Sequence, residues 1–553
     1  MELATYQQDF DPVHHSLGLS SLVAVLPLLV LFVLLGVLRL KAWLASLIAL
    51  AACLVMATTV YSMPVGDALN SGLLGAAFGF FPIMWIVINA IWIYTMTVET
   101  GHFDVLRRTF ASVSDDQRIQ AIIIAFSFGA LLEALAGFGT PVAITSVMLI
   151  ALGFRPLKAA TVALVANTAP VAFGAMAIPI TTLSGVTNIP TDTLGDMVGR
   201  QTPILSIFVP LVLVFIVDGR RGVAKTWVAA LTAGVSFGLA QWITSNYLSV
   251  PLTDIVASLF SVLMVVALLR VWQPGERLGG ARPTPVIAGG AADSPTPEFA
   301  QRAAHPDSRA DVVRAYAPYA IIIVVFVLAQ IEPIKTWLDD PTKIVGWPGL
   351  HITTASGKAS TLPQFKLNWL NAAGSLLLIS GVLTAVALKV SVGRTLRAYW
   401  ATLVQLRWAI LTVMAVLGLA YVMNASGQTI TLGTWMAGAG GFFAFLAPVL
   451  GWLGTAVTGS DTSSNSLFGA LQVAAAGKAD LSPVLLSAAN SSGGVLGKMV
   501  SPQNLAIAAA AVGMDGKEGD IFRKVILWSV IFLLGMCLLA LLQSVTILSW
   551  MVP

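Results

Sequence analysis

Charged residues are scarce in this sequence. Of its 553 residues, only 10% are Asp, Glu, Lys or Arg, whereas 57% are hydrophobic, and the mean hydropathy is +0.86. Soluble domains carry about 25% charged residues, so this composition excludes a soluble globular fold. The net charge of +4 does not indicate a nucleic-acid partner, because the basic residues lie in short loops between apolar runs.

Cysteine and histidine are scarce as well. Cys53 and Cys537 lie far apart in apolar runs, so neither a disulfide framework nor a metal site is expected. None of the five histidines forms an HExxH-type pair at membrane depth, which argues against a membrane-embedded enzyme. We therefore expect no catalytic residues, no cofactor and no bound metal.

Long apolar runs are the main feature that the sequence does contain. Twelve are close to the roughly 20 residues needed to cross a bilayer. Two further regions, 119–152 and 441–476, are interrupted by GFGTP and GSDTS, and their second arms are too short to cross, so we predict two re-entrant hairpins. This pattern predicts an all-α polytopic membrane protein. The twelve spans are 19–38, 42–62, 79–98, 157–183, 203–218, 224–247, 251–272, 313–331, 368–389, 407–425, 481–508 and 522–550.

The basic residues predict the orientation. With the N-terminus outside, 23 of the 30 Lys and Arg residues fall in cytoplasmic loops and six fall outside. This bias favours both termini outside the cytoplasm. Seven spans separate the two hairpins, and an odd number inverts the second hairpin relative to the first.

One sequence unit occurs twice. The hairpin tip ALAGFGTP at 134–141 corresponds to AVTGSDTS at 456–463. Repetition combined with inversion is typical of alternating-access carriers, whose binding site lies between the repeats near the midplane. Further matched positions are Asn167 with Asn490, Thr168 with Ser491, Gly174 with Gly497, Met176 with Met499, Pro179 with Pro502, and 100–102 with 426–428.

The repeat predicts the domain organisation. Residues 1–272 form an N-terminal half with the hairpin 119–152 and a broken helix at 157–183. Residues 313–553 form a C-terminal half with the hairpin 441–476 and a broken helix at 481–508. The stretch 273–312 between them is rich in Pro, Gly and Ala and is predicted to be a flexible cytoplasmic linker.

Helix starts within the broken segments are candidate anion sites. Thr140 followed by Pro141 predicts a capped half-helix whose free N–H groups point back at Gly137 and Gly139. Ser501 with Pro502 predicts a second start, with glycines 493 and 494 upstream. The alternative interpretation is that these glycines serve only close helix packing.

Three charged residues lie at the same depth. Lys498 could neutralise a substrate carboxylate, or form a structural ion pair. Glu133 is the first choice for a proton-coupling carboxylate, since its own repeat offers no basic partner. Asp461 could also couple protons, but it could instead cap a helix starting at Thr462 or pair with Lys498.

Neutral polar residues in the broken segments suit a 2-hydroxy acid, although they could also bind Na⁺ or repair helix breaks. The predicted substrate-binding set is Gly137, Gly139, Thr140, Asn167, Thr168, Ser463, Asn490, Ser491, Ser492 and Lys498, with Glu133 and Asp461 for proton coupling.

Several long motifs resemble the bacterial L-lactate permease family. They are FGALLEALAGFGTPVAIT, VANTAPVAFGAMAIPI, GWLGTAVTGSDTSSNSLFGALQ, SPQNLAIAAAAVG and the N-terminal QQDFDP. The resemblance implies proton-coupled uptake of L-lactate, with D-lactate and glycolate as further substrates, across a bacterial inner membrane. It also implies inverted repeats with hairpin tips, as in the wider ion-transporter group. The binding residues given above are inferred from the repeats.

Other functions remain as alternatives. A sodium-coupled carboxylate symporter would need Na⁺ at fixed pH, and an anion channel would pass current without coupling. A lactate sensor would need a signalling domain, which is not visible in the sequence.

Overall fold

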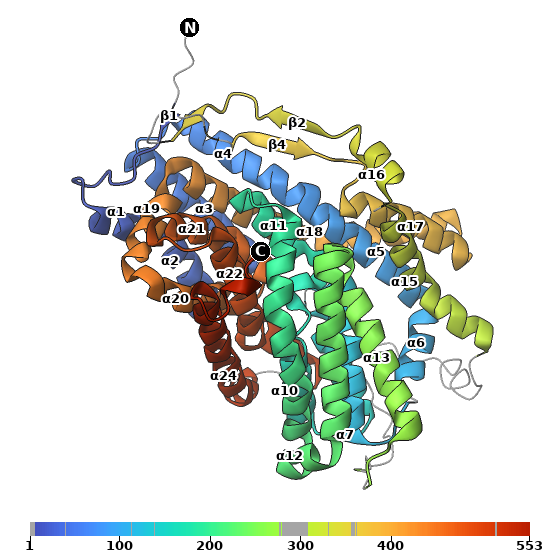
Figure 1. Ribbon diagram of the computed structural model, residues 1–553. Coiled ribbons are helices and arrows are strands. Elements are labelled where there is room, and N and C mark those ends of the chain that lie inside the picture. Colours follow the sequence, from blue (N-terminus) through green and yellow to red (C-terminus); the bar gives the residue numbers. More distant parts are fainter. Residues whose placement is uncertain are drawn as a thin grey trace.

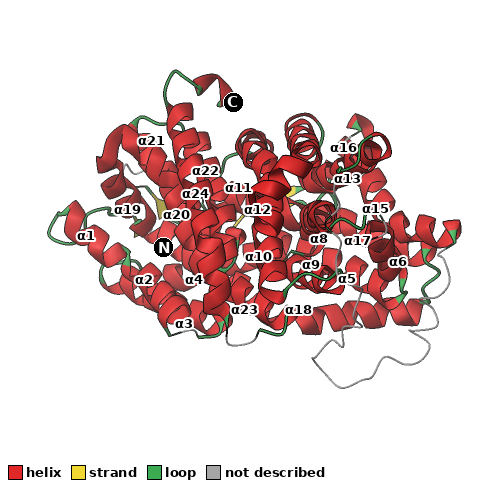
Figure 2. Cartoon of the chain, turned by 90° about the horizontal axis from the view of Figure 1, so that it is seen from below, coloured by secondary structure: helices red, strands yellow, loops and turns green. Residues whose placement is uncertain are grey.

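The computed structural model is a helical bundle with short strands at one end (Figures 1 and 2). It describes residues 6–38, 40–111, 113–137, 139–275, 278, 308–329, 331–354, 360, 362–514 and 517–553. Within these residues, ten helices are long and apolar enough to cross a membrane, and one bent pair would add an eleventh. Helices satisfy their own backbone hydrogen bonds, as lipid requires. The predicted all-α polytopic membrane class is confirmed.

The N-terminal half is almost entirely helical. Its elements are β1 (Tyr6–Gln7), α1 (Leu17–Ala24), α2 (Leu26–Phe32), η1 (Val33–Val37), α3 (Ala42–Thr59), α4 (Val65–Phe78), η2 (Gly79–Met84), α5 (Trp85–Glu99), α6 (His102–Ala111), α7 (Gln117–Gln120), η3 (Ala121–Phe128), α8 (Gly129–Ala136), α9 (Thr140–Ala151), α10 (Pro156–Ala166), η4 (Val171–Phe173), α11 (Gly174–Thr187), α12 (Thr191–Tyr247), η5 (Val250–Leu252) and α13 (Thr253–Val271).

The C-terminal half adds three short strands to its helices. Its elements are α15 (Arg309–Ala329), α16 (Glu332–Asp339), β2 (Lys343–Gly346), β3 (Ile352–Thr353), β4 (Gln364–Leu367), α17 (Ala373–Ala387), α18 (Val392–Ser426), α19 (Gln428–Met436), η6 (Ala437–Phe442), α20 (Phe443–Thr458), α21 (Asp461–Ala479), α22 (Pro483–Gly497), η7 (Lys498–Val500), α23 (Pro502–Ala511), α24 (Glu518–Ser544) and η8 (Ser549–Met551). Most of the predicted linker 273–312 lies outside the described residues.

Helix α12 consists of two arms. Its backbone leaves helical geometry at Asp218 and Gly219, and the arms pack so closely that a Cβ on Gly234 would meet the backbone of Ile207 at 2.5 Å. Gly238 likewise approaches Pro203, so the two arms run antiparallel. These arms correspond to the predicted spans 203–218 and 224–247. The break therefore lies at one end of the two arms, at the bottom of Figure 1, and the α12–α13 connection lies at the other end of the arms.

Helix α18 is longer than the predicted span 407–425. It extends over 35 residues and packs along α3, α4 and α5. The predicted span began too late because Arg394, Arg397 and Arg407 interrupt the apolar window at its N-terminal end. Long basic side chains can extend to the membrane surface while their helix continues, so these arginines do not end α18.

The chain departs from regular helix where the repeat predicts. Gly137 and Gly459 occupy matched positions after α8 and α20, and both have positive φ, +44° and +77°. Glycines 101 and 427 are a second matched pair, with φ of +76° and +92°, each between two helices. Only glycine adopts such angles at little cost. The backbone thus repeats the features that the sequence repeats.

The two halves exchange contacts in a reciprocal manner. Helix α9, the second arm of the first predicted hairpin, packs on α23, which follows the break in the second broken helix. Helix α21, the second arm of the second predicted hairpin, packs on α11, which follows the break in the first broken helix. This exchange is what the predicted repeat would produce. The inverted orientation and the re-entrant character of the hairpins stay predictions.

Close packing of α20 on α22 supplies a stability prediction. A Cβ on Gly493 would collide with the backbone of Pro448, and overpacking of this kind costs about 1–3 kcal/mol. We expect Gly493→Ala to lower the midpoint of thermal unfolding in detergent. Gly477→Ala is the control, since a Cβ on Gly477, in an exposed part of α21, meets nothing within 4 Å. An equal loss in both variants would contradict this packing.

Candidate functional site

A buried ion pair joins the two halves. Nζ of Lys498 lies 2.5 Å from Oε1 of Glu133, and the side chains are 7% and 4% exposed. Asn167, at the end of α10, donates from Nδ2 to Glu133 Oε2 at 2.9 Å. The hypothesis that Lys498 pairs with Asp461 is therefore wrong, because its partner comes from the opposite half. Both oxygens of the Glu133 carboxylate have a donor.

Glycines make room for this carboxylate. A Cβ on Gly174 would lie 2.8 Å from Glu133 Oε1, closer than real contacts allow. A Cβ on Gly137 would lie 3.7 Å from the same oxygen. At Gly174, backbone and not a side chain therefore lies against Glu133.

The charges do not follow the repeat. Counting from the matched asparagines, Lys498 corresponds to Ala175, and from the matched tips Glu133 corresponds to Thr455. The first half thus provides the acid and the second half the base. A pair formed by the equivalent positions, Ala175 and Thr455, would carry no charge, so the Glu133–Lys498 ion pair has no counterpart in the repeat.

Asp461 begins α21 and is buried, with 3% exposure. Its Oδ2 accepts from Ser491 Oγ at 2.6 Å and from Asn465 Nδ2 at 3.4 Å, whereas Oδ1 has no partner among the described residues. The predicted role of Asp461 as a helix cap is wrong. The cap is Ser460, whose hydroxyl accepts from the backbone of Ser463.

The other predicted cap also differs from the structure. Helix α9 begins at Thr140 itself, and its cap is Gly139, which makes no side-chain hydrogen bond. Ser501 does cap α23, since its hydroxyl accepts from Asn504 N at 3.3 Å and Pro502 follows. Glycine at the first cap lets α9 approach α23, where a Cβ on Gly139 would collide with Ile507.

Several predicted binding residues hold helices together instead. Asn490 donates to Asn465 Oδ1 at 2.9 Å, and Ser492 donates to Gln201 of α12 at 2.7 Å. Thr168 donates to the carbonyl of Val165, which repairs the helix break. Glycines 493 and 494 also pack inside the bundle, the latter against Asp461 and Thr455.

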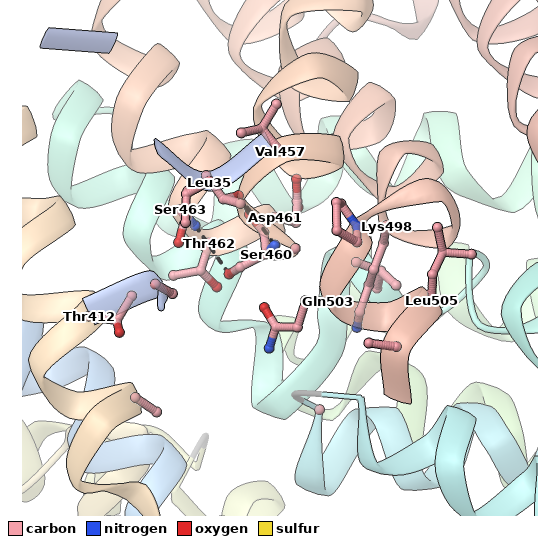
Figure 3. A pocket seen from close by; sticks show the side chains of 18 of the residues that line it. Leu35, Thr412, Val457, Ser460, Asp461, Thr462, Ser463, Lys498, Gln503 and Leu505 are labelled. Carbon is pink, nitrogen blue, oxygen red and sulfur yellow. Dashed lines mark hydrogen bonds between the residues drawn. The ribbon is translucent and has the colours of Figure 1, made fainter. Parts of the chain in front are cut away.

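A cavity of about 1220 Å³ lies beside the ion pair. Figure 3 shows the α21 tip, from Ser460 to Ser463, on one side and Lys498 with Gln503 on the other. This volume exceeds that of typical ligand pockets, so it can hold water as well as a small ligand. Predicted residues that line it are Gly137, Ser463, Lys498, Glu133 and Asp461.

One end of the cavity is buried and the other reaches the surface. At the buried end lie Glu133 and Lys498, whereas Trp408 and Phe522 at the other end are 47% and 39% exposed. Lys41 lines the same exposed end. A small anion could therefore diffuse from the surface to the Lys498 ammonium.

Sequence reasoning missed two polar residues of the site and its surroundings. Gln503 lines the cavity directly after Pro502, and the predicted half-helix start could have identified it. Asp254 is fully buried in the first turn of α13. It resembled an interfacial residue at the end of a span, so its position gave no signal. Among the described residues, no group of three His, Cys, Asp or Glu side chains could hold a metal ion.

Comparisons with known proteins agree with these features. A family model described as L-lactate permease matches residues 20–547. The chain is 41% identical to the L-lactate permease of Bacillus subtilis (strain 168), over 99% of this chain and 100% of that protein. It is 40% identical to the glycolate permease GlcA of Escherichia coli (strain K12), over 98% of both.

Among solved structures, the YdaH transporter of Alcanivorax borkumensis has a TM-score of 0.44 at 15% identity, over 85% of this chain and 86% of that one. This likeness is too distant to support an argument. The family match over nearly the whole sequence, together with relatives at about 40% identity, shows that the chain belongs to the L-lactate permease family, whose named members are transporters and not enzymes.

Proposed function

We propose that this protein carries L-lactate, D-lactate and glycolate together with a proton across a bacterial inner membrane by alternating access. The observation that supports this most directly is the Glu133–Lys498 ion pair at the buried end of a cavity that reaches the surface. An anion and a proton can act on such a pair together. The names of the relatives support the substrate class.

The pair couples the two substrates by competition. In the structure, the Lys498 ammonium donates to the Glu133 carboxylate. A proton on Glu133 removes its negative charge, which frees the ammonium to bind the lactate carboxylate. Release of lactate lets Glu133 lose its proton and return to Lys498. Each cycle thus moves one anion and one proton.

This coupling overcomes the membrane potential. Moving one anion inward against a negative interior costs about 2.3 kcal/mol per 100 mV, and an accompanying proton cancels this cost. Asp461 is the second candidate for the proton, because its Oδ1 has no described partner. The two carboxylates differ in their partners: Glu133 contacts Lys498, the cation proposed to bind the substrate, whereas Asp461 does not form this ion pair.

The hydroxyl of a 2-hydroxy acid needs its own partners. Ser463 lines the cavity, and Asn167 is released when Glu133 changes its contacts. Backbone N–H groups at the start of α21 can also approach the substrate carboxylate, and Gly137 lines the same cavity. The remaining predicted residues are proposed to hold the helices that carry these binding groups. They are Gly139, Thr140, Thr168, Asn490, Ser491 and Ser492.

The cavity mouth agrees with the orientation proposed from charge. The exposed lining residues Lys41, Trp408 and Phe522 lie in or beside the loops 39–41, 389–407 and 517–524, all predicted to be cytoplasmic. With both termini outside, the carrier is therefore open toward the cytoplasm.

Uptake into proteoliposomes tests the function as a whole. Radiolabelled lactate should accumulate when a pH gradient, acidic outside, is imposed without sodium. A sodium gradient at uniform pH should drive no accumulation, since the proposed coupling uses protons alone. Accumulation driven only by sodium would support a sodium-coupled symporter instead.

Glu133→Gln tests the proton carrier. Glutamine is neutral, like protonated Glu133, so Lys498 should still be able to bind lactate. Unlike Glu133, however, glutamine cannot release a proton. We expect pH-driven accumulation to be lost while lactate exchange across the membrane continues. Glu332→Gln, which changes an exposed acid at the start of α16, is the control. Unchanged uphill uptake by Glu133→Gln would remove Glu133 from this role.

Lys498→Ala tests the substrate contact. Loss of the ammonium should raise the half-saturation concentration for lactate at least about tenfold, because a charge-assisted contact is worth roughly 1.5–3 kcal/mol. Lys478→Ala, at an exposed position of α21, should leave it unchanged. A normal half-saturation concentration in Lys498→Ala would assign Lys498 to structure.

A further inference from the structure

Asp254 is a buried acid that the proposed cycle does not yet use. It lies in the first turn of α13 and its exposed fraction is 0%. Its Oδ1 accepts from Gln241 Nε2 at 2.9 Å, while its Oδ2 has no partner among the described residues. An unpaired carboxylate is poorly stabilised in such a place, and a neutral carboxylic acid fits it better.

The elements packed against α13 provide no cation for Asp254. Of these, α11, η3 and η5 contain no charged residue, and α8 contributes only Glu133, which is also an acid. The charged residues of α12 lie in its first ten residues and around its break at 218–225. Arg200, a basic residue among the first ten, donates to Asn246 Oδ1 and to the carbonyl of Met551. Within the described residues Asp254 therefore has no ion-pair partner, and a bound proton would neutralise it.

Gln241 connects Asp254 to the broken helix. Its Nε2 also donates to the carbonyl of Ala169 at 3.3 Å, in the break between α10 and η4. Two residues earlier in the same break, Asn167 donates to Glu133. Glu133 is thus bound by the Asn167 side chain, which belongs to the break, and Asp254 by the Gln241 side chain, which is bonded to the break. A movement of this segment would change the contacts of both acids.

Asp254 lies away from the cytoplasmic mouth. Neither Asp254 nor Gln241 is among the residues that line the cavity. Gln241 is 22 residues from the break at Gly219, which is about 33 Å along a helix. Between Asp254 and the α12–α13 corner, Thr244 and Ser249 have buried hydroxyls with no described partner. Polar groups of this kind can be solvated when water enters.

We propose that Asp254 is a second proton-carrying carboxyl, which passes the proton between the outer end of α12 and Glu133. The inference rests on the proposed proton symport. In each transfer, the O–H bond of Asp254 breaks, the proton binds a carboxylate oxygen of Glu133, and the Glu133–Lys498 ion pair separates. The Asp254 carboxylate then takes a new proton from external water. The proton and the anion thereby reach the centre by different routes.

Net uptake and exchange separate this role from a structural one. Net uptake requires a proton to arrive and leave in each cycle, whereas exchange of lactate for lactate can proceed with Glu133 protonated throughout. We therefore expect Asp254→Asn, measured in proteoliposomes, to reduce pH-driven net uptake at least about tenfold while exchange at acidic pH stays within about twofold. Asp254→Glu, which keeps a titratable group, should restore part of the net uptake.

The control is Asp192→Asn, which changes an exposed acid at the same end of α12 and should leave both rates unchanged. Equal loss of exchange and net uptake in Asp254→Asn would assign Asp254 to structure and overturn the inference, as would unchanged net uptake. Failure of the wild-type protein to respond to a pH gradient would instead overturn the proposed symport, so the two failures are distinguishable.

Discussion

The ion pair between Glu133 and Lys498 is the constraint on which the rest of the site depends. Removing each charge from water costs several kcal/mol, so neither residue is stable there without the other or a substitute. The partners come from α8 and η7, in opposite halves of the chain. Breaks in both halves are needed to bring them together, and Gly174 must lack a side chain to leave space for the carboxylate. The interrupted helices are therefore a requirement of this contact.

The repeated backbone and the unrepeated charges have different physical roles. Matched glycines at 137 and 459 both take positive φ at the tips, and α9 packs on α23 as α11 packs on α21. In the proposed alternating-access cycle, equivalent contacts of this kind would allow two arrangements of similar energy. The charge pair breaks this equivalence, because its symmetric counterpart consists of Ala175 and Thr455. The proposed anion site is therefore single, although the sequence unit occurs twice.

The sequence predicted the breaks well and the partners less well. Glycine, proline and a matched spacing mark where a helix must stop, since these residues act through the local backbone, and Gly137, Ser501 and Pro502 lie as expected. Which face of a helix meets the cavity depends on neighbours that a uniformly apolar sequence does not reveal. Asn490 and Ser492 therefore bond to adjacent helices, and Asp461 bonds to Ser491. Asp254 was missed because position alone cannot distinguish a buried acid from an interfacial one.

Charge neutrality explains why the proposed coupling would be strict. In the empty carrier the Glu133 carboxylate and the Lys498 ammonium cancel, and in the loaded carrier lactate replaces the carboxylate while the proton neutralises Glu133. Both states bury no net charge at the centre, so both can change conformation in a low-dielectric region. A proton without lactate would bury one positive charge, and lactate without a proton would bury one negative charge. Either costs several kcal/mol. Partly loaded carriers would therefore change conformation rarely, and a leak of protons or of lactate alone would be suppressed by the same contact that binds the substrate.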